Sequence, residues 1–444
     1  MPSESITGGD ARSRRYKTEV VRSALFKVIS AAATFAALPI TIKYLGVEVF
    51  GVWSAMLAIV SWVILFDLGL GNGLRNKVAD AVARGDESIA AEYAATAYQF
   101  LGVLLFIIWL CAMAASFALP WQRIFNIDSV AATELAIAVQ VLMTFLLANF
   151  WIGLVVSLAS AMQRMSWVSG AQMFANLLAL ALVLMLSKLT VPSLVLIASA
   201  YGGALIISNI VLSCVVFKYF PYLWPVQRAN FARGRSIINL GSRFFIIQLA
   251  GLMVFLTDKM LITQLLGPAY VTEYELMVRL MSILTLAHTT LSAPLWSAYT
   301  EAFSSGDFLW IKRTLGNQIR YFSLFIAAAV VLLLGADTIY SVWIGADIAV
   351  STNTLFWVTL LALLTVWNNI FAMFVNGVGE IGIQVVTAII AIIVNIPISI
   401  FLVKIVGLGL SGIAIATILS LLPAAIALPL HARFILRRHV ETPL

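Results

Sequence analysis

Long apolar stretches alternate with short polar ones along the whole chain. A transmembrane helix needs about 20 apolar residues to cross a hydrocarbon core of roughly 30 Å, and each stretch reaches about that length. The stretches lie near residues 22–44, 48–71, 93–119, 133–160, 168–187 and 191–217 in the first half, and near 238–266, 272–299, 315–343, 351–376, 381–403 and 408–432 in the second. The pattern predicts an all-α polytopic membrane protein with about 12 transmembrane helices in two six-helix bundles.

The two halves of the chain repeat each other at a fixed separation of 221 residues. The matches are Arg22 with Arg243, Leu45-Gly46 with Leu266-Gly267, and residues 79–86 with 300–307. Such gap-free matches favour a duplication over the chance alignment of apolar helices. Because each half has an even number of spans, both halves are expected to enter the membrane in the same direction. In transporters with parallel repeats the substrate site lies at the repeat interface.

A Gly-Asp pair ends the polar segment in each copy of the repeat. Gly85 and Gly306 are placed to end a helix in the left-handed conformation that glycine adopts at low cost. Asp86 and Asp307 are placed to cap the next helix with a side-chain oxygen. Each pair is therefore expected to join two helices by a tight turn.

The basic residues are distributed unequally between the two sides of the predicted topology. With the N-terminus in the cytoplasm, 20 of the 27 Lys and Arg residues fall on that side and six on the other, while Lys27 lies within the first span. Cytoplasmic loops of membrane proteins carry such an excess, so both termini are expected to be cytoplasmic. The expected segments are a cytoplasmic N-terminus (1–21), an N-terminal bundle (22–217), a cytoplasmic linker (218–237), a C-terminal bundle (238–432) and a cytoplasmic tail (433–444).

Composition supports the membrane assignment and argues against several classes of function. Apolar residues make up 62% of the 444 positions and charged residues only 11%, whereas soluble domains have about 25% charged residues. The net charge of +7 comes from basic residues spread over separate cytoplasmic segments, which argues against a nucleic-acid partner. The predicted connections are short and leave little room for an extramembrane enzyme domain. We therefore expect no catalytic residues and no enzyme activity.

Motifs for cofactors and metals are also missing from the sequence. It contains no Walker A motif, and its glycine-rich run at 69–73 follows an apolar helix rather than a strand. Its three histidines and two cysteines lack the spacing of a zinc site. The sequence thus predicts neither a cofactor nor a metal centre.

Ionisable residues within the spans are the remaining candidates for chemistry, because they are costly in a bilayer and normally face a protein interior or a watery cavity. Arg22, Lys27 and Arg243 lie in the cytoplasmic half, with Asp67 near the end of the second span and Arg75 just beyond it. Four basic residues against one acid predict a positively charged cavity. Arginine is well shaped for bidentate contact with phosphate. The four basic residues are therefore predicted to bind an anionic substrate such as a lipid diphosphate.

A second group of ionisable residues lies in the second half of the chain. Asp258, Lys259 and Arg279 are predicted towards the outer side, as secondary candidates for the substrate site. His288 falls near the middle of the eighth span and is the repeat counterpart of Asp67. Asp67 and His288 are the candidates for ion or proton exchange during transport.

These candidates also have purely structural explanations. Basic residues near span ends can simply extend to the membrane interface. Asp67 could form a structural ion pair with Arg75 or Lys27, and Asp258 and Lys259 could neutralise each other near the outer interface. The histidine could be a neutral side chain in the protein interior. The sequence leaves these alternatives open.

Three segments of the N-terminal region together resemble a known family. They are Leu38-Pro39, residues 45–53 (LGVEVFGVW) and residues 67–77 (DLGLGNGLRNK). This region resembles the N-terminal signature of O-antigen and exopolysaccharide flippases (Wzx-like), in the superfamily that also contains multidrug (MATE) exporters and lipid II flippases. A weaker resemblance continues through Asp258-Lys259 and residues 294–298.

The resemblance implies a MATE-like fold, a V-shaped pair of six-helix bundles in the bacterial cytoplasmic (inner) membrane. It also implies a task, which is to move a polyprenyl-diphosphate-linked oligosaccharide from the inner to the outer leaflet by alternating access. Members of this family have a cationic central cavity, and this role transfers to Arg22, Lys27, Arg75 and Arg243. Beyond the substrate and the lipid bilayer, the implied partners are a polysaccharide polymerase and other assembly proteins.

The sequence thus favours a lipid-linked oligosaccharide flippase. Two other classes of function are alternatives. A cation-coupled small-molecule antiporter of the multidrug type would share the fold and would depend on Asp67 more than on the arginines. A membrane-embedded glycan polymerase or glycosyltransferase would need catalytic carboxylates or a sizeable loop, and the outer loops are short and poor in acid. A purely structural membrane protein would not explain a duplicated bundle.

Overall fold

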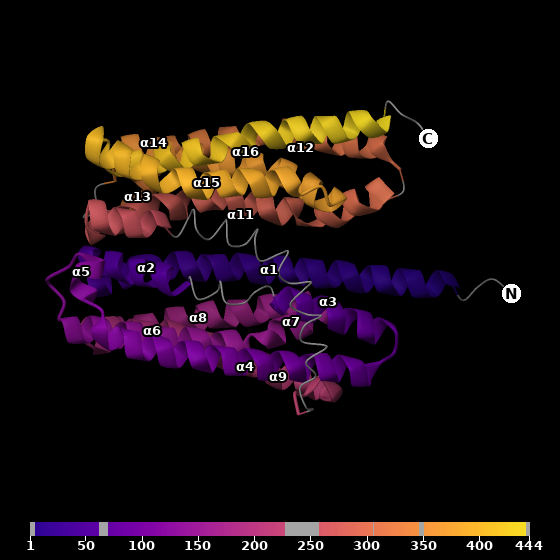
Figure 1. Cartoon of the computed structure of the whole chain (residues 1–444), viewed down its shortest axis with the longest axis horizontal. Helices are drawn as coiled ribbons and strands as arrows, with labels where there is room; N and C mark the ends of the chain where they lie inside the picture. Colours follow the sequence, from indigo (N-terminus) through magenta and orange to yellow (C-terminus); the bar gives the residue numbers. More distant parts are fainter. Residues whose placement is uncertain (1–4, 62–69, 227–256, 305, 346–349, 441–444) are drawn as a thin grey trace. The chain divides into compact units, whose positions relative to one another are not determined.

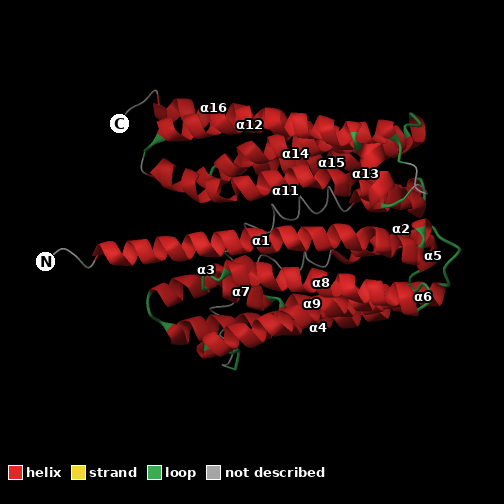
Figure 2. Cartoon of the chain, turned by 180° about the vertical axis from the view of Figure 1, so that it is seen from behind, coloured by secondary structure: helices red, strands yellow, loops and turns green. Residues whose placement is uncertain are grey.

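The computed structural model of the chain describes residues 5–61, 70–226, 257–304, 306–345 and 350–440. Within these ranges the regular elements are all helices and no strand occurs (Figure 2). The chain divides into two compact units, Met1–Phe245 and Ile246–Leu444. This division falls among residues outside the described ranges, so the expected linker (218–237) and the expected start of the second bundle stay predictions.

The N-terminal unit is a bundle of helices joined mostly by short turns (Figure 1). Its elements are α1 (Ser5–Leu45), α2 (Val47–Ser61), α3 (Leu70–Ala83), α4 (Glu87–Ala118), α5 (Trp121–Phe125), α6 (Ala132–Ile152), α7 (Leu154–Ala161), α8 (Met165–Leu189), α9 (Leu194–Tyr219) and a 3-10 turn, η2 (Pro221–Leu223). Helix α1 packs along α8, while α6 and α9 pack along each other. Helices distant in sequence therefore form the main contacts of this unit.

The C-terminal unit is a second bundle with a similar order of elements. A helix at residues 257–265 comes first. It is followed by α11 (Pro268–Ser304), α12 (Phe308–Leu334), α13 (Ala336–Trp343), α14 (Thr352–Val378), α15 (Gly382–Ile400), a π-helical turn η3 (Phe401–Ile405) and α16 (Gly409–Val440). Helix α14 packs against both α11 and α16, so it occupies the middle of this unit.

Nine helices in the described part of the chain are long and apolar enough to cross a membrane. They confirm the predicted spans one, three to six and nine to twelve. Their bounds are Val21–Leu45, Glu87–Ala118, Ala132–Ala161, Met165–Leu189, Leu194–Tyr219, Phe308–Leu334, Thr352–Val378, Gly382–Ile405 and Gly409–Arg438.

The other three predicted spans have different outcomes. The second, 48–71, begins as the apolar helix α2, and its continuation at 62–69 lies outside the described residues. The seventh, 238–266, is described only from residue 257, where it is helical. The eighth, 272–299, is helix α11, which carries charged residues and is less apolar than the other nine. The chain is thus a polytopic helical membrane protein, as predicted.

The predicted duplication has a clear signature in the backbone of four glycines. Gly46 and Gly267, which are 221 residues apart, have φ of 81° and 110°, and Gly85 and Gly306 have φ of 80° and 75°. Non-glycine residues rarely adopt this left-handed conformation. The same turn geometry at the same separation supports a common origin for the two halves.

The aspartates that follow these turns behave differently from each other. The Asp307 carboxylate accepts a hydrogen bond from the Trp310 backbone N–H at 3.0 Å and caps α12, as predicted. Asp86 occupies the equivalent position before α4 but makes no such bond, so the prediction is wrong there. The two residues have similar φ and ψ, of −93° and 72° for Asp86 and −82° and 64° for Asp307. Only the side-chain orientation therefore differs.

Small residues line the helix contacts, while large apolar residues face outward. Helix α4 buries a run of alanines, from Ala90 to Ala97, at its contact with α3. Small side chains allow membrane helices to approach closely. Phe117 and Leu334 are each 81% exposed, which suits contact with lipid rather than with water. This distribution is the one expected of helices that lie in a bilayer.

Candidate functional site

The residues predicted to bind substrate are only partly covered by the structure. Arg243 and Asp67 lie outside the described residues, so nothing is learned of their positions. Arg22 and Lys27 are exposed on α1, and Arg75 is exposed on α3. Five residues along a helix correspond to a rotation of about 140°, so Arg22 and Lys27 project from different flanks of α1. Their predicted role stays a prediction.

Helix α1 is held to α8 by hydrogen bonds between small polar side chains. The hydroxyl groups of Ser23 and Ser169 lie 2.6 Å apart. Two turns further along α8, the Asn176 amide donates to Ser30 Oγ at 2.7 Å and to Thr34 Oγ1 at 3.1 Å. This polar seam fixes the rotation of α1 about its own axis, and with it the directions in which the two basic residues of α1 project.

His288 lies inside the C-terminal unit on α11. It is 2% exposed, and its ring stands edge-on to that of Phe325, with 5.5 Å between centroids. Its Nε2 atom has no hydrogen-bond partner among the described residues. An aromatic neighbour and an unpaired ring nitrogen agree with a neutral histidine in the protein interior. They do not test a role in proton exchange.

Three charged side chains meet near the start of α11 and form a charged cluster of Lys259, Glu275 and Arg279. The Glu275 carboxylate lies 2.6 Å from Lys259 Nζ through Oε2 and 3.0 Å from Arg279 Nη2 through Oε1. The Glu275 side chain is 9% exposed, against 21% for Lys259 and 32% for Arg279. One buried acid therefore serves two cations that both reach the surface of a cavity.

Asp258 is next to the charged cluster in sequence but belongs to a separate hydrogen-bond network. Its Oδ2 atom accepts from Thr417 Oγ1 at 2.9 Å and from the Tyr274 hydroxyl at 3.4 Å. The Asn395 amide in turn donates to Thr417 Oγ1 at 3.1 Å. Asp258 is only 1% exposed. This Asp258 network therefore joins the helix at 257–265 to α11, α15 and α16.

Several oxygen atoms around Asp258 are buried without a partner. Among the described residues, Asp258 Oδ1 and Asn395 Oδ1 receive no hydrogen bond, and neither does Ser399 Oγ one helical turn beyond Asn395 on α15. Pro397 lies between Asn395 and Ser399 on α15. This helix is followed by a π-helical turn that begins at Phe401. Irregular backbone at membrane depth is tolerated where it lines a cavity or is buried in protein. The surroundings of Asp258 are thus rich in unsatisfied oxygen ligands.

The charged cluster and Asp258 line one cavity of about 410 Å³ inside the C-terminal unit. Two basic and two acidic side chains face it, so its formal charges balance when all four are ionised. Polar and apolar residues from α11 and α14 complete the lining, including Ser282, Thr285 and Thr365. The volume is in the range of small-molecule sites in proteins.

The repeat shows that these charges are not needed to build the fold. At a separation of 221 residues, the N-terminal counterparts of Asp258, Lys259, Glu275 and Arg279 are Ala37, Leu38, Ser54 and Ala58. All four counterparts are buried and uncharged. The same positions are filled by small or apolar residues in the N-terminal half, and by charged residues that line a cavity in the C-terminal half. Charges at membrane depth without a need in folding point to function.

Glu275 is the residue of this site that sequence analysis missed. The prediction named Asp258, Lys259 and Arg279, which the structure brings to one cavity, but not the acid that connects two of them. The spacing of Glu275 and Arg279 (i, i+4 on a helix) was an available signal, because such pairs lie on one helix face. The Tyr274, Asn395 and Thr417 partners of Asp258 come from three helices and had no comparable signal.

Within the described residues, no three His, Cys, Asp or Glu side chains are grouped closely enough to hold a metal ion. Cys111 and Cys214 are both free and exposed. The candidate site is therefore built from charged pairs and neutral oxygen atoms.

Comparisons with known proteins agree with this architecture. A family model described as "Polysaccharide biosynthesis protein" matches residues 19–293. A putative O-antigen export protein of Yersinia pseudotuberculosis is 22% identical over 362 residues, which cover 80% of this chain and 82% of that protein. A putative O-antigen transporter of Salmonella typhimurium is 23% identical over 376 residues, covering 81% and 83%.

Solved structures show the same fold at low sequence identity. An inward-facing multidrug resistance MATE family transporter of the MOP superfamily aligns with a TM-score of 0.76 at 14% identity, covering 94% of this chain and 96% of that one. A MOP superfamily transporter from Pyrococcus furiosus, described as having a binding pocket of reverse polarity, aligns with a TM-score of 0.66 at 17% identity, covering 96% and 97%. Since the family model covers more than half of the chain, the protein belongs to the polysaccharide biosynthesis protein family, and it is a multi-pass membrane transporter with the MATE-like fold that its resemblance to Wzx-like flippases predicts.

Proposed function

We propose that this transporter is a flippase that moves a polyprenyl-diphosphate-linked oligosaccharide across the bacterial cytoplasmic membrane by alternating access. The family and the names of the two O-antigen relatives support this substrate class. Such a substrate has an anionic diphosphate, a polar glycan and an apolar tail. A helical transporter offers the head a polar route while the tail stays in lipid. The role is transport and not catalysis.

The observation that carries the proposal is the charged cluster in the C-terminal unit. Lys259 and Arg279 both contact the Glu275 carboxylate, and both line the 410 Å³ cavity. Arg279 Nε is buried without a hydrogen-bond partner among the described residues, so the guanidinium has donors to spare. Charge-assisted hydrogen bonds from Arg to phosphate oxygens are strong and directional. This geometry suits a diphosphate group.

Asp258 is the residue that best supports coupling to a cation. While it is ionised, the four charges lining the cavity balance. Uptake of a proton or of Na⁺ by Asp258 would leave the cavity with one net positive charge and strengthen its hold on an anion. The unpaired side-chain oxygen of Asn395, which Thr417 connects to Asp258, is a hard ligand of the kind that such cations take. Asp67 and His288 remain further candidates for coupling.

The remaining sequence predictions form part of the same proposal. Arg22, Lys27, Arg75 and Arg243 would supply the positive charge of a central cavity in the cytoplasmic half of the membrane. Both termini would be cytoplasmic, and a polysaccharide polymerase and other assembly proteins would act on the exported product. Each of these features can be tested separately from the charged cluster.

The proposal is tested by reconstituting the full chain in proteoliposomes that contain a fluorescent polyprenyl-diphosphate oligosaccharide. A quencher added outside reports how much of the lipid is on the outer face, so protein-dependent movement between leaflets changes the protected fraction. We expect such movement. If none occurs, and the same vesicles export an organic cation when a pH gradient is imposed, the protein is a multidrug-type antiporter instead.

A further inference from the structure

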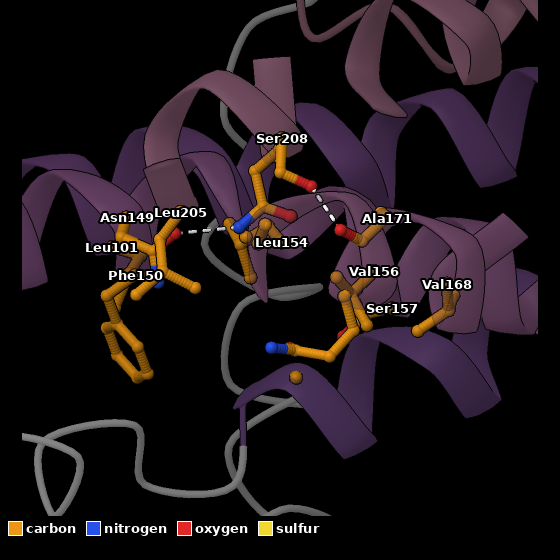
Figure 3. A pocket seen from close by; sticks show the side chains of 15 residues that line it. Leu101, Asn149, Phe150, Leu154, Val156, Ser157, Val168, Ala171, Leu205 and Ser208 are labelled. Carbon is orange, nitrogen blue, oxygen red and sulfur yellow. Dashed lines mark hydrogen bonds between the residues drawn. The ribbon is translucent and has the colours of Figure 1, made fainter. Parts of the chain in front are cut away.

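The N-terminal unit contains a second cavity, of about 330 Å³, whose lining carries no charge. It lies where α6 ends at Ile152 and α7 begins at Leu154, between these helices and α8 and α9 (Figure 3). Its polar lining residues are Asn149, Ser157, Gln172, Ser208 and Asn209. Uncharged amides and hydroxyls in a membrane helix bundle need partners, because lipid supplies none.

Close helix contacts explain why the amides gather at this point. A side chain at Gly202 would overlap Phe145, since its Cβ would come within 2.4 Å of Phe145 Cβ, so α6 and α9 touch there. One to two turns further along, the Asn209 amide donates to Asn149 Oδ1 at 2.8 Å. The Ser208 hydroxyl donates to the Ala171 carbonyl of α8. These bonds hold α6, α8 and α9 around the cavity (Figure 3).

The break between α6 and α7 opens the bundle beside this amide pair. The Gly153 N–H bonds the Asn149 carbonyl at 2.7 Å, and a Cβ at residue 153 would come within 2.6 Å of that oxygen. Glycine is therefore required for the chain to turn here. The helix at the corresponding place in the C-terminal unit, α14, runs without a break from Thr352 to Val378. Interrupted helices at membrane depth often line binding sites in transporters.

Several hydrogen-bonding groups in this cavity are available to a ligand. Among the described residues, the Ser157 hydroxyl, Asn149 Nδ2, Asn209 Oδ1 and Gln172 Oε1 have no hydrogen-bond partner in the structure. Gln172 is exposed, so the cavity is reached from the surface at this residue. These groups include both hydrogen-bond donors and acceptors, and none of them is charged. Such a lining suits a neutral ligand with several hydroxyl groups.

The position of the cavity also fits the loading of a substrate. Gly153 lies eight residues before the end of α7, and Gln172 lies seven residues after the start of α8. Each is therefore roughly 10–12 Å along the helix axis from that helix end. Both helix ends meet at the turn that carries Arg164, on the side predicted to be cytoplasmic. A headgroup entering from that side would reach this depth while its lipid tail stayed in the bilayer.

We propose that this cavity is a carbohydrate subsite that binds one neutral sugar unit of the glycan through the Asn149–Asn209 pair and Ser157. Its volume of about 330 Å³ is large enough for a monosaccharide. The assignment of the sugar to a lipid-linked glycan rests on the proposed function. The recognition of a neutral sugar rests on the cavity alone.

The test uses the full chain in lipid nanodiscs and saturation-transfer NMR with methyl glycosides of neutral hexoses and N-acetylhexosamines. At least one glycoside should bind. The Asn149→Leu/Asn209→Leu double variant should weaken binding by roughly tenfold or more, because a site built for hydroxyls loses its paired groups. Replacing both partners by apolar residues of similar shape is tolerated in folding better than replacing one. Asn353→Leu, at an exposed position of the C-terminal unit, should leave binding unchanged.

A second variant keeps the test independent of folding defects in the first. Ser157→Phe fills the cavity without replacing either amide of the pair, and it should also abolish binding. Absence of glycoside binding to the unchanged protein, unchanged binding in both variants, or equally good binding of cyclohexanol would overturn the subsite. Flipping of the lipid-linked glycan without glycoside binding would refute this subsite alone. Glycoside binding without flipping would refute the proposed function alone.

Discussion

Glu275 holds the charged cluster together, because it is the acid that both Lys259 and Arg279 contact. Removing an ion from water costs several kcal/mol in a protein interior. Two cations with one acid are tolerable here because both cations keep part of their side chain exposed to the cavity. An anionic ligand in the cavity could contact both cations. The three side chains of the cluster carry one net positive charge, which Asp258 balances within the cavity while it is ionised.

Replacing Arg279 by Gln should weaken binding of the diphosphate headgroup. A hydrogen bond to a charged group contributes about 1.5–3 kcal/mol, or roughly ten- to 150-fold in affinity. The measurement is calorimetric titration of a short-chain prenyl diphosphate into the purified protein. Arg320→Gln, at an exposed site on α12, is the matched control and should bind as the unchanged protein does. Equal affinity in the Arg279 and Arg320 variants would exclude Arg279 from the phosphate site.

Replacing Asp258 by Asn should remove the dependence of headgroup binding on pH and Na⁺. The amide keeps the shape of the carboxylate and can still accept from Thr417 and Tyr274, but it carries no charge. The variant should therefore bind the prenyl diphosphate as the cation-loaded protein does, under all conditions. The same titration repeated across pH and Na⁺ concentration checks this. A variant whose affinity still changes with either ion would place coupling elsewhere, with Asp67 and His288 the next residues to test.

The residue scale also shows what a linear pattern can and cannot predict. Asp258, Lys259 and Arg279 stand out in sequence because charges are rare in apolar spans. Their partners do not, since Thr417 and Asn395 are ordinary polar residues that matter only because α15 and α16 place them beside Asp258. On α1 the depth of Lys27 relative to Arg22 was predictable, but the polar seam with α8 that sets their directions was not.

At the scale of helices, the hydrophobic pattern is a reliable guide because lipid demands long apolar segments whose backbone is satisfied internally. The nine confirmed spans all follow from it. Breaks within spans are harder to predict. The change from α6 to α7 at Gly153 depends on a close backbone approach that no local periodicity reveals. Helix α11 shows the reverse, because it forms despite its charged residues. Glu275 pairs with Lys259 of the preceding helix and with Arg279 on α11 itself.

Glycines in the left-handed conformation are required at the repeated turns. Gly267→Ala should destabilise the protein, since φ of 110° strains a side chain even though no atom lies within 4 Å of its Cβ. Backbone strain of this kind costs about 1–3 kcal/mol. Gly316→Ala is the control, because Gly316 lies within helix α12, also with open space around a Cβ, and alanine favours helix there. Thermal unfolding in detergent should show a lower transition temperature for the first variant and an equal or higher one for the second. A higher transition temperature for Gly267→Ala than for Gly316→Ala would show that the turn at residue 267 does not require glycine.

At the scale of the whole molecule, the duplication has been followed by divergence. The shared turns and helix order preserve a common framework, whereas the chemistry differs. The C-terminal unit has a cavity lined by four charges, and the N-terminal unit has one lined by neutral amides and hydroxyls. A substrate with a charged diphosphate and a neutral glycan needs both kinds of surface. A duplicated transporter can provide them without separate domains.

The predicted topology can be tested by cysteine labelling in whole cells. In a background with Cys111 and Cys214 replaced by Ala, single cysteines at Asp86 and Asp128 report the two ends of the N-terminal unit, because α4 crosses between them. Excess positive charge on one side predicts that a membrane-impermeant reagent labels Asp128→Cys only. Labelling of Asp86→Cys instead would show that the orientation in the membrane is opposite to the predicted one. The sides at which substrate is loaded and released would then be exchanged.

The most direct test of the central claim is leaflet exchange of a fluorescent polyprenyl-diphosphate oligosaccharide by the Lys259→Gln/Arg279→Gln double variant in proteoliposomes. The control is Lys312→Gln/Arg313→Gln, which removes the same charges from exposed positions on α12. We predict that the unchanged protein and the control move the lipid between leaflets, and that the cluster variant loses at least about tenfold in rate, as expected for lost charge-assisted contacts. Equal rates in the cluster variant and the control would contradict a role for this cavity in carrying the diphosphate.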